Sequence, residues 1–130
     1  MRRALIVEDD EVSAQILSAL LEDDFKCDIA PNGEEGLKMY DQSFEKDPYD
    51  IIFLDIMMPI KDGQELLKDI RNLEKSHEVQ KDQKVKIVMT TALGDFDNVA
   101  EAFKGKCDGY LVKPIIPEKL TELLEQLGVV

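Results

Sequence analysis

Short apolar runs alternate along this chain with longer stretches in which apolar residues recur at helical spacing. The apolar runs occupy residues 3–7, 27–30, 51–54, 85–89 and 110–112. Each run has the length of a buried strand and is too short for a helix. Apolar residues recur every three or four positions within residues 12–21, 37–44, 63–73, 96–103 and 117–127. The pattern predicts five units, each a strand followed by a helix.

The predicted strands are apolar throughout rather than alternately apolar and polar. This favours a parallel sheet covered by helices on both faces. Right-handed crossovers then give a doubly wound α/β fold with a five-stranded parallel sheet and five helices. A chain of 130 residues has the size of one domain. We therefore expect residues 1–130 to form a single domain with no output domain after the last helix.

One polar stretch, residues 74–84 (EKSHEVQKDQK), separates the third helix from the fourth strand. We expect it to continue the third helix and then to form a solvated loop. It contains His77, the only histidine of the chain. We expect His77 to be exposed and without a role.

The charge of the chain limits its partners. Its net charge is −12, which argues against direct nucleic-acid binding, because phosphate contacts need clustered Lys and Arg. Such a charge suits a protein that binds cations or basic partners. The apolar runs are too short to span a bilayer, so we expect no membrane contact and a cytoplasmic location. Two cysteines, Cys27 and Cys107, are too few for a disulfide framework or a zinc site.

Polar side chains follow four of the five predicted strands: Glu8 and Asp9, Asp55, Thr91, and Lys113. In open α/β sheets, binding sites form at the carboxyl ends of the strands. Carboxylates crowded together at this edge would repel one another and raise their pKa values. A hard divalent cation such as Mg²⁺, bound by carboxylates and waters, relieves that repulsion. Lys113 adds a second positive charge.

Asp55 stands within the apolar segment IFLDIMM at residues 52–58, where a carboxylate is costly to bury. A carboxylate next to Mg²⁺ and a lysine can act as a nucleophile towards phosphorus. The two positive charges and the Thr91 hydroxyl can stabilise the transferring phosphoryl group. The residues therefore favour Asp55 as a phosphoryl acceptor.

Four motifs carry a family resemblance: LIVEDD (5–10), FLDIMMPIKDG (53–63), IVMTTA (87–92) and GYLVKP (109–114). Together, and in this order on alternating strands and helices, they resemble the receiver domains of bacterial two-component response regulators, the CheY-like class. The resemblance implies a flavodoxin-like fold with strand order 2-1-3-4-5. It also implies a switch or relay protein, rather than an enzyme, which assists its own phosphorylation and dephosphorylation.

The resemblance assigns roles to individual residues. Asp55 is implied to accept a phosphoryl group from a histidine kinase or a histidine phosphotransfer protein. Asp9 is implied to ligate Mg²⁺ or Mn²⁺ directly, with Glu8 nearer the waters of the metal. Met57 is implied to contribute its backbone carbonyl. Asp10 is a less favoured ligand, although the sequence leaves that register open.

The resemblance also implies residues that respond to phosphorylation. Lys113 is implied to pair with the phosphoryl group, and Lys113–Pro114 to be a cis peptide. Thr91 and Tyr110 are the implied switch residues, acting on a downstream protein at the surface of the fourth helix, fifth strand and fifth helix. Met57 and Leu93 offer an attacking water no hydrogen-bond partner, so we expect slow decay of the phosphorylated form.

Simpler roles remain open for each residue. The acids at residues 8–10 can cap the first helix, Thr91 can be an ordinary strand residue, and Tyr110 can belong to the core. Two other classes of protein remain as alternatives. A phosphatase with an aspartate nucleophile usually has a second acid two residues later, where this chain has Met57. A flavodoxin-like cofactor binder needs a phosphate-binding loop after the first strand, where this chain is acidic.

Overall fold

The computed structural model describes residues 2–56 and 63–130. Its strands are β1 (Arg2–Val7), β2 (Phe25–Ala30), β3 (Ile51–Asp55), β4 (Lys86–Ala92) and β5 (Gly109–Lys113). Its α-helices are α1 (Glu11–Leu21), α2 (Gly33–Ser43), α3 (Gly63–Ser76), α4 (Phe96–Ala102) and α5 (Pro117–Gln126). Two short 3₁₀ turns, η1 (Lys81–Gln83) and η2 (Leu93–Asp95), flank β4. The predicted alternation of strands and helices is confirmed.

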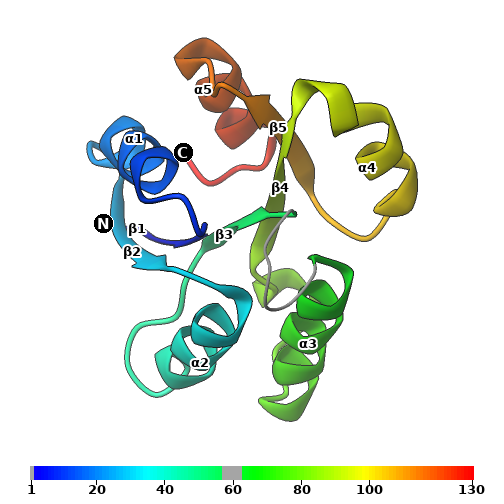
Figure 1. The fold of residues 1–130 in the computed structure, drawn as a ribbon. Coiled ribbons are helices and arrows are strands. Elements are labelled where there is room, and N and C mark those ends of the chain that lie inside the picture. Colours follow the sequence, from blue (N-terminus) through cyan, green and yellow to red (C-terminus); the bar gives the residue numbers. More distant parts are fainter. Residues whose placement is uncertain (1, 57–62) are drawn as a thin grey trace.

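All strand pairs are parallel, and the strand order is β2-β1-β3-β4-β5, as predicted. Helices α1 and α5 cover one face of the sheet, and α2, α3 and α4 cover the other (Figure 1). Side chains of β3 are buried on both faces, which explains why this strand is apolar throughout. Because β1 and β3 are neighbours in register, the residues that follow them meet at one edge of the sheet.

Helix α1 has an apolar face wider than the surface that it buries. The helical spacing predicts a buried face with residues at positions 12, 16, 17, 20 and 21. Of these, Leu17 and Leu21 are buried, whereas Val12, Ile16 and Leu20 are 66%, 53% and 36% exposed. The exposed three are spaced four residues apart and therefore form one row along the helix. We call Val12, Ile16 and Leu20 the α1 row.

The polar stretch at residues 74–84 continues α3 to Ser76, as predicted, and Glu74 within this helix end is buried. Glu74 is 1% exposed. It accepts hydrogen bonds from the Tyr40 hydroxyl at 3.2 Å and the Val85 backbone N–H at 2.8 Å. Arg71 lies 2.5 Å from its other oxygen. This buried carboxylate joins α2, α3 and the start of β4.

His77 is exposed, as predicted, but it is not without contacts. Its ring stacks on Phe44, with centroids 4.1 Å apart, and its Nε2 lies 2.9 Å from Asp41. Both partners lie at the end of α2. The contacts of His77 therefore fasten the extended end of α3 to α2, which is a structural role that the sequence did not predict.

Candidate phosphoryl-acceptor and metal site

Three carboxylates meet at the carboxyl edge of the sheet. Glu8 and Asp9 follow β1, Asp55 ends β3, and one oxygen of each lies within 4.8 Å of the others. The register that pairs Val7 with Leu54 brings these strand ends side by side. Glu8 and Asp55 are each 6% exposed, whereas Asp9 is open to solvent. The cluster offers a cation two buried carboxylates and one accessible carboxylate.

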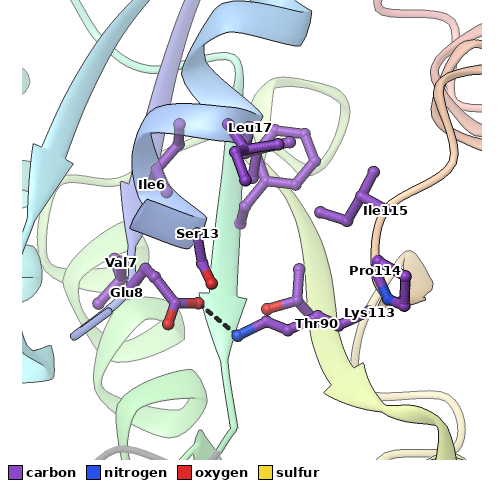
Figure 2. Close-up of a pocket in the computed structure, with 11 residues that line it drawn as sticks. Ile6, Val7, Glu8, Ser13, Leu17, Thr90, Lys113, Pro114 and Ile115 are labelled. Carbon is purple, nitrogen blue, oxygen red and sulfur yellow. Dashed lines mark hydrogen bonds and ion pairs between the residues drawn. The ribbon is translucent and has the colours of Figure 1, made fainter. Parts of the chain in front are cut away.

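Lys113 reaches this cluster from the end of β5, on the far side of β4. Its Nζ lies 2.7 Å from Glu8 Oε2 and 3.5 Å from Asp55 Oδ2. Figure 2 shows the bond between Glu8 and Lys113 across the end of the sheet. One ammonium group thus balances part of the negative charge on two buried carboxylates.

Burial and neighbouring charges set the protonation of this cluster. Burial raises the pKa of Glu8 to about 7, with the hydrogen bond from Lys113 opposing the shift and Asp55 adding to it. Burial acts to lower the pKa of Lys113, but the hydrogen bond to Glu8 and the carboxylate of Asp55 outweigh it, so this pKa is raised. The lysine is therefore charged at neutral pH, and Glu8 gains or loses a proton there. Once Glu8 has lost its proton, its carboxylate can interact with a bound cation instead.

Asp10 lies outside the carboxylate cluster and caps α1. Its side chain accepts hydrogen bonds from the backbone N–H of Ser13, at 3.2 Å, and from the Ser13 hydroxyl. These bonds lower its pKa. The sequence left open which of the acids at residues 8–10 face the metal and which cap the helix. The structure places Glu8 and Asp9 with Asp55, and Asp10 at the cap.

Two threonines, Thr90 and Thr91, lie near the carboxyl end of β4 and point to opposite faces of the sheet. Thr91 is 1% exposed and its hydroxyl donates to the carbonyl of Ala92 at 3.3 Å. Thr90 pairs with Asp55 in the strand register, and its hydroxyl donates to the carbonyl of Leu54 at 3.3 Å. Successive strand residues alternate in direction, so Thr91 faces the side of α2, α3 and α4, whereas Thr90 faces α1. Thr90 was not among the residues predicted for the site.

Tyr110 connects β5 to α4. Its hydroxyl donates to the carbonyl of Ala100 at 3.4 Å, and its ring meets that of Phe96 edge to face, 6.0 Å between centroids. Burial raises its pKa to about 12, so it is protonated at neutral pH. The Lys113–Pro114 peptide is cis. Met57 and the side chain of Leu93 lie outside the described part of the chain.

A cavity of about 150 Å³ adjoins the Glu8–Lys113 pair. Figure 2 shows it between α1, the ends of β3 and β4, and the segment after β5. Its walls include Leu17, Phe53 and Ile115, while Ser13 and Thr90 contribute hydroxyls. Ile16 of the α1 row also lines it, so the exposed apolar row reaches to the edge of the acidic site.

The fold and the site together define a class of small α/β proteins in which a parallel sheet presents carboxylates and a lysine at its carboxyl edge. The chain belongs to the response regulator receiver domain family, whose model matches residues 4–125. It is 35% identical to the chemotaxis protein CheY of Halobacterium salinarum over 114 aligned residues. The aligned region covers 87% of this chain and 85% of that protein. The predicted family, fold and role in two-component signalling are therefore confirmed.

Two solved structures extend the comparison. The receiver domain of AraT, a response regulator from Geobacillus stearothermophilus, is 25% identical with a TM-score of 0.76, over 98% of this chain and 95% of that one. The receiver domain of Saccharomyces cerevisiae Ssk1, solved with the histidine phosphotransfer protein Ypd1, is 26% identical with a TM-score of 0.78. The match covers 99% of this chain and 92% of that one.

The chain spans about half the length of several transcriptional regulators that it matches. Within residues 2–56 and 63–130, no helix has the length and apolar character needed to cross a membrane.

Proposed function

We propose that Asp55 accepts a phosphoryl group from a phosphohistidine of a kinase or a phosphotransfer protein. The observation that carries this proposal is the position of Asp55, buried at a strand end with Lys113 Nζ 3.5 Å from its carboxylate. In the reaction, an Asp55 oxygen forms a bond to phosphorus while the phosphorus–nitrogen bond to the donor histidine breaks. The histidine nitrogen keeps the electron pair of that bond. His77, the only histidine of residues 1–130, is held 2.9 Å from Asp41 at the end of α2, so the donor histidine lies outside these residues.

The residues of the cluster fit a resident Mg²⁺ or Mn²⁺, because all three are oxygen donors within 4.8 Å of one another. We propose that Asp9 and Asp55 ligate the metal directly, that Glu8 acts through its waters, and that the carbonyl of Met57 completes the set. When bound, the metal offsets the negative charge that gathers around the phosphoryl group. Lys113 supplies the second positive charge and holds a phosphoryl oxygen, and the hydroxyl of Thr91 donates to another.

We propose that phosphorylation is read at the surface formed by α4, β5 and α5. Thr91 follows Thr90, which pairs with Asp55 in the sheet, and Tyr110 connects β5 to α4 through Ala100 and Phe96. A change at Thr91 that moved β4 would alter the packing of Tyr110 against α4. A downstream protein that binds this surface would then distinguish the phosphorylated chain from the unphosphorylated one.

We propose that the phosphodonor docks over the α1 row. This row is exposed, apolar and continuous with the cavity beside Glu8 and Lys113. The Ssk1 receiver domain, which shares this fold, was solved with a phosphotransfer protein. A donor seated on α1 would have its histidine at the carboxyl edge of the sheet, where Asp55 lies.

We propose that residues 1–130 act as one receiver domain, because a single sheet and a family match over residues 4–125 account for the chain. We propose that it is a switch that assists its own phosphorylation and dephosphorylation and acts on no separate substrate. A cytoplasmic location and the absence of nucleic-acid binding fit the unpaired cysteines, Cys27 and Cys107, and the net charge of −12.

Two phosphodonors separate the acceptor chemistry from docking. Acetyl phosphate tests Asp55 alone, and a phosphorylated histidine phosphotransfer protein such as Ypd1 tests docking as well. We expect Asp55→Asn to lose labelling from both donors. We expect Ile16→Glu to keep labelling from acetyl phosphate and to lose most transfer from the protein donor. The control is Gln15→Glu, which makes the same charge change on an adjacent exposed residue and should keep labelling from both donors. Equal transfer to Ile16→Glu and Gln15→Glu would contradict the docking proposal and leave the acceptor proposal intact.

A further inference from the structure

A groove of about 830 Å³ lies between α3 and the turn that joins α4 to β5. Figure 1 shows α3 and this turn on the same side of the sheet. Four cationic side chains and one acidic side chain line the groove: Lys68, Arg71, Lys84, Lys106 and Glu65. This composition is the reverse of that of the whole chain, which carries a net charge of −12.

The three lysines of the groove differ from Arg71 in their contacts. Arg71 is held by Glu74, at 2.5 Å, and lies 3.5 Å from Asp108, so its charge is balanced locally. Lys68, Lys84 and Lys106 are exposed and, within the described ranges 2–56 and 63–130, form no ion pair. Their charge is therefore available to a ligand, and a groove with low-dielectric walls concentrates the field of such charges.

The lining and rim of the groove suit an extended ligand better than a small anion. Leu67 and Phe103 are 4% and 3% exposed and contribute apolar surface to the groove lining. Gly105 lies at the rim with a φ of +75°, and a Cβ added there would meet no atom within 4 Å. A small anion needs several donors that converge on one point, whereas these exposed lysines come from three segments, α3, the residues before β4 and the turn before β5, and share the groove lining with apolar residues.

We propose that this groove binds an acidic segment of a partner protein. Its carboxylates would pair with Lys68, Lys84 and Lys106, and an apolar side chain would cover Leu67 and Phe103. Electrostatic complementarity would steer an acidic segment to this one region of an otherwise acidic molecule. Nucleic acid fits less well, because three exposed lysines are a small basic surface and the remaining charge repels phosphate.

The groove is separate from the acceptor site. Lys84 precedes β4 and Lys106 precedes β5, so the groove lies towards the amino ends of these strands. Asp55 ends β3 at the opposite edge of the parallel sheet. The groove can therefore be occupied while Asp55 is phosphorylated, and the proposal does not depend on Asp55 as the acceptor.

The probe for this proposal is a fluorescein-labelled synthetic peptide in which Glu and Asp flank a Phe-Leu pair. Its control is the same peptide with Gln and Asn in place of the acids. We expect the full chain to bind the acidic peptide at low ionic strength, more weakly as salt is added, and to bind the control peptide much less. Amide chemical shift changes should gather around residues 67–71, 84 and 103–106.

Two triple variants that make the same change in net charge, one inside the groove and one outside it, test the role of the groove lysines. Lys68→Glu/Lys84→Glu/Lys106→Glu should weaken peptide binding by roughly tenfold or more. Lys26→Glu/Lys38→Glu/Lys119→Glu replaces three exposed lysines elsewhere and should change it far less. Equal weakening in both variants, no binding to the wild type, or shift changes away from the groove would overturn the proposal. Tighter, lysine-dependent binding of a DNA duplex in place of the peptide would also overturn it.

Discussion

The ammonium group of Lys113 lies between two buried carboxylates, 2.7 Å from Glu8 and 3.5 Å from Asp55. In the unphosphorylated protein, Lys113 thus supplies Glu8 and Asp55 with the positive charge that a bound metal ion would also supply. The same lysine is the one proposed to bind the phosphoryl group. In the proposed active form, Glu8 would turn from Lys113 to the waters of the metal, and Lys113 would turn from Glu8 to the phosphoryl group. The resting contacts of the site are thus different from those of its proposed active form.

Removal of the lysine tests this competition. In Lys113→Ala the carboxylates of Glu8 and Asp55 lose their shared cation, so we expect the metal-free protein to unfold more easily, by about 1–3 kcal/mol. Mg²⁺ should then raise the melting temperature of Lys113→Ala by more than it raises that of the wild type. Lys119→Ala, which removes an exposed lysine on α5, is the control and should behave like the wild type. A smaller Mg²⁺ response in Lys113→Ala than in the wild type would contradict the competition.

The raised pKa of Glu8 predicts how stability changes with pH. The folded protein holds a proton on Glu8 up to about pH 7, whereas the unfolded chain releases it near the ordinary value of 4.5. Within this window the folded state binds more protons, so its stability falls as pH rises, by up to about 3 kcal/mol for this group. Denaturant unfolding of the metal-free wild type and Glu8→Gln between pH 5 and about pH 8 measures this difference. Parallel stability curves for the two proteins would show that Glu8 titrates normally.

The separate positions of Asp9 and Asp10 predict opposite effects of the two residues. Asp9→Asn should weaken Mg²⁺ binding sharply, because it removes a charged ligand from the cluster. Asp10→Ala should lose the α1 cap and destabilise the protein by about 1 kcal/mol, while Mg²⁺ affinity changes little. Calorimetric titration gives the affinity and thermal unfolding gives the stability. A larger loss of Mg²⁺ affinity in Asp10→Ala would place the ligand at Asp10.

The buried carboxylate of Glu74 predicts a large effect on stability without an effect on the site. Glu74→Ala leaves the Tyr40 hydroxyl, the Val85 N–H and Arg71 without this partner, so we expect a loss of about 2–4 kcal/mol. Glu122→Ala on α5 removes an exposed carboxylate and should cost less than about 0.5 kcal/mol. Labelling by acetyl phosphate at low temperature should survive in both variants. Equal unfolding midpoints for the two variants would contradict the structural role of Glu74.

The strands, the helices and the place of the site follow from local pattern in the sequence, whereas the strand order was implied by the family resemblance. Apolar runs predicted the strands, and strand ends predicted where Glu8, Asp55 and Lys113 meet. The family resemblance favoured Asp9 over Asp10 as the ligand, but local pattern left the choice open, since three consecutive acids differ only in backbone geometry. The buried state of Glu74 depends on Tyr40 and Val85, which lie 34 and 11 residues away in the chain. The exposure of the α1 row depends on how much of the helix its neighbours cover, and helical spacing does not reveal this.

The central claim is that Asp55 carries the phosphoryl group, and chemical trapping tests it most directly. The protein is incubated with acetyl phosphate and Mg²⁺ and then reduced with borohydride, which converts an aspartyl phosphate to homoserine. Peptide mass spectrometry then identifies the converted residue. We predict homoserine at position 55 in the wild type, with none in Asp55→Asn or when EDTA removes the metal. Homoserine at any other aspartate of the wild type, or phosphorylation that persists in Asp55→Asn to the same extent, would contradict the account.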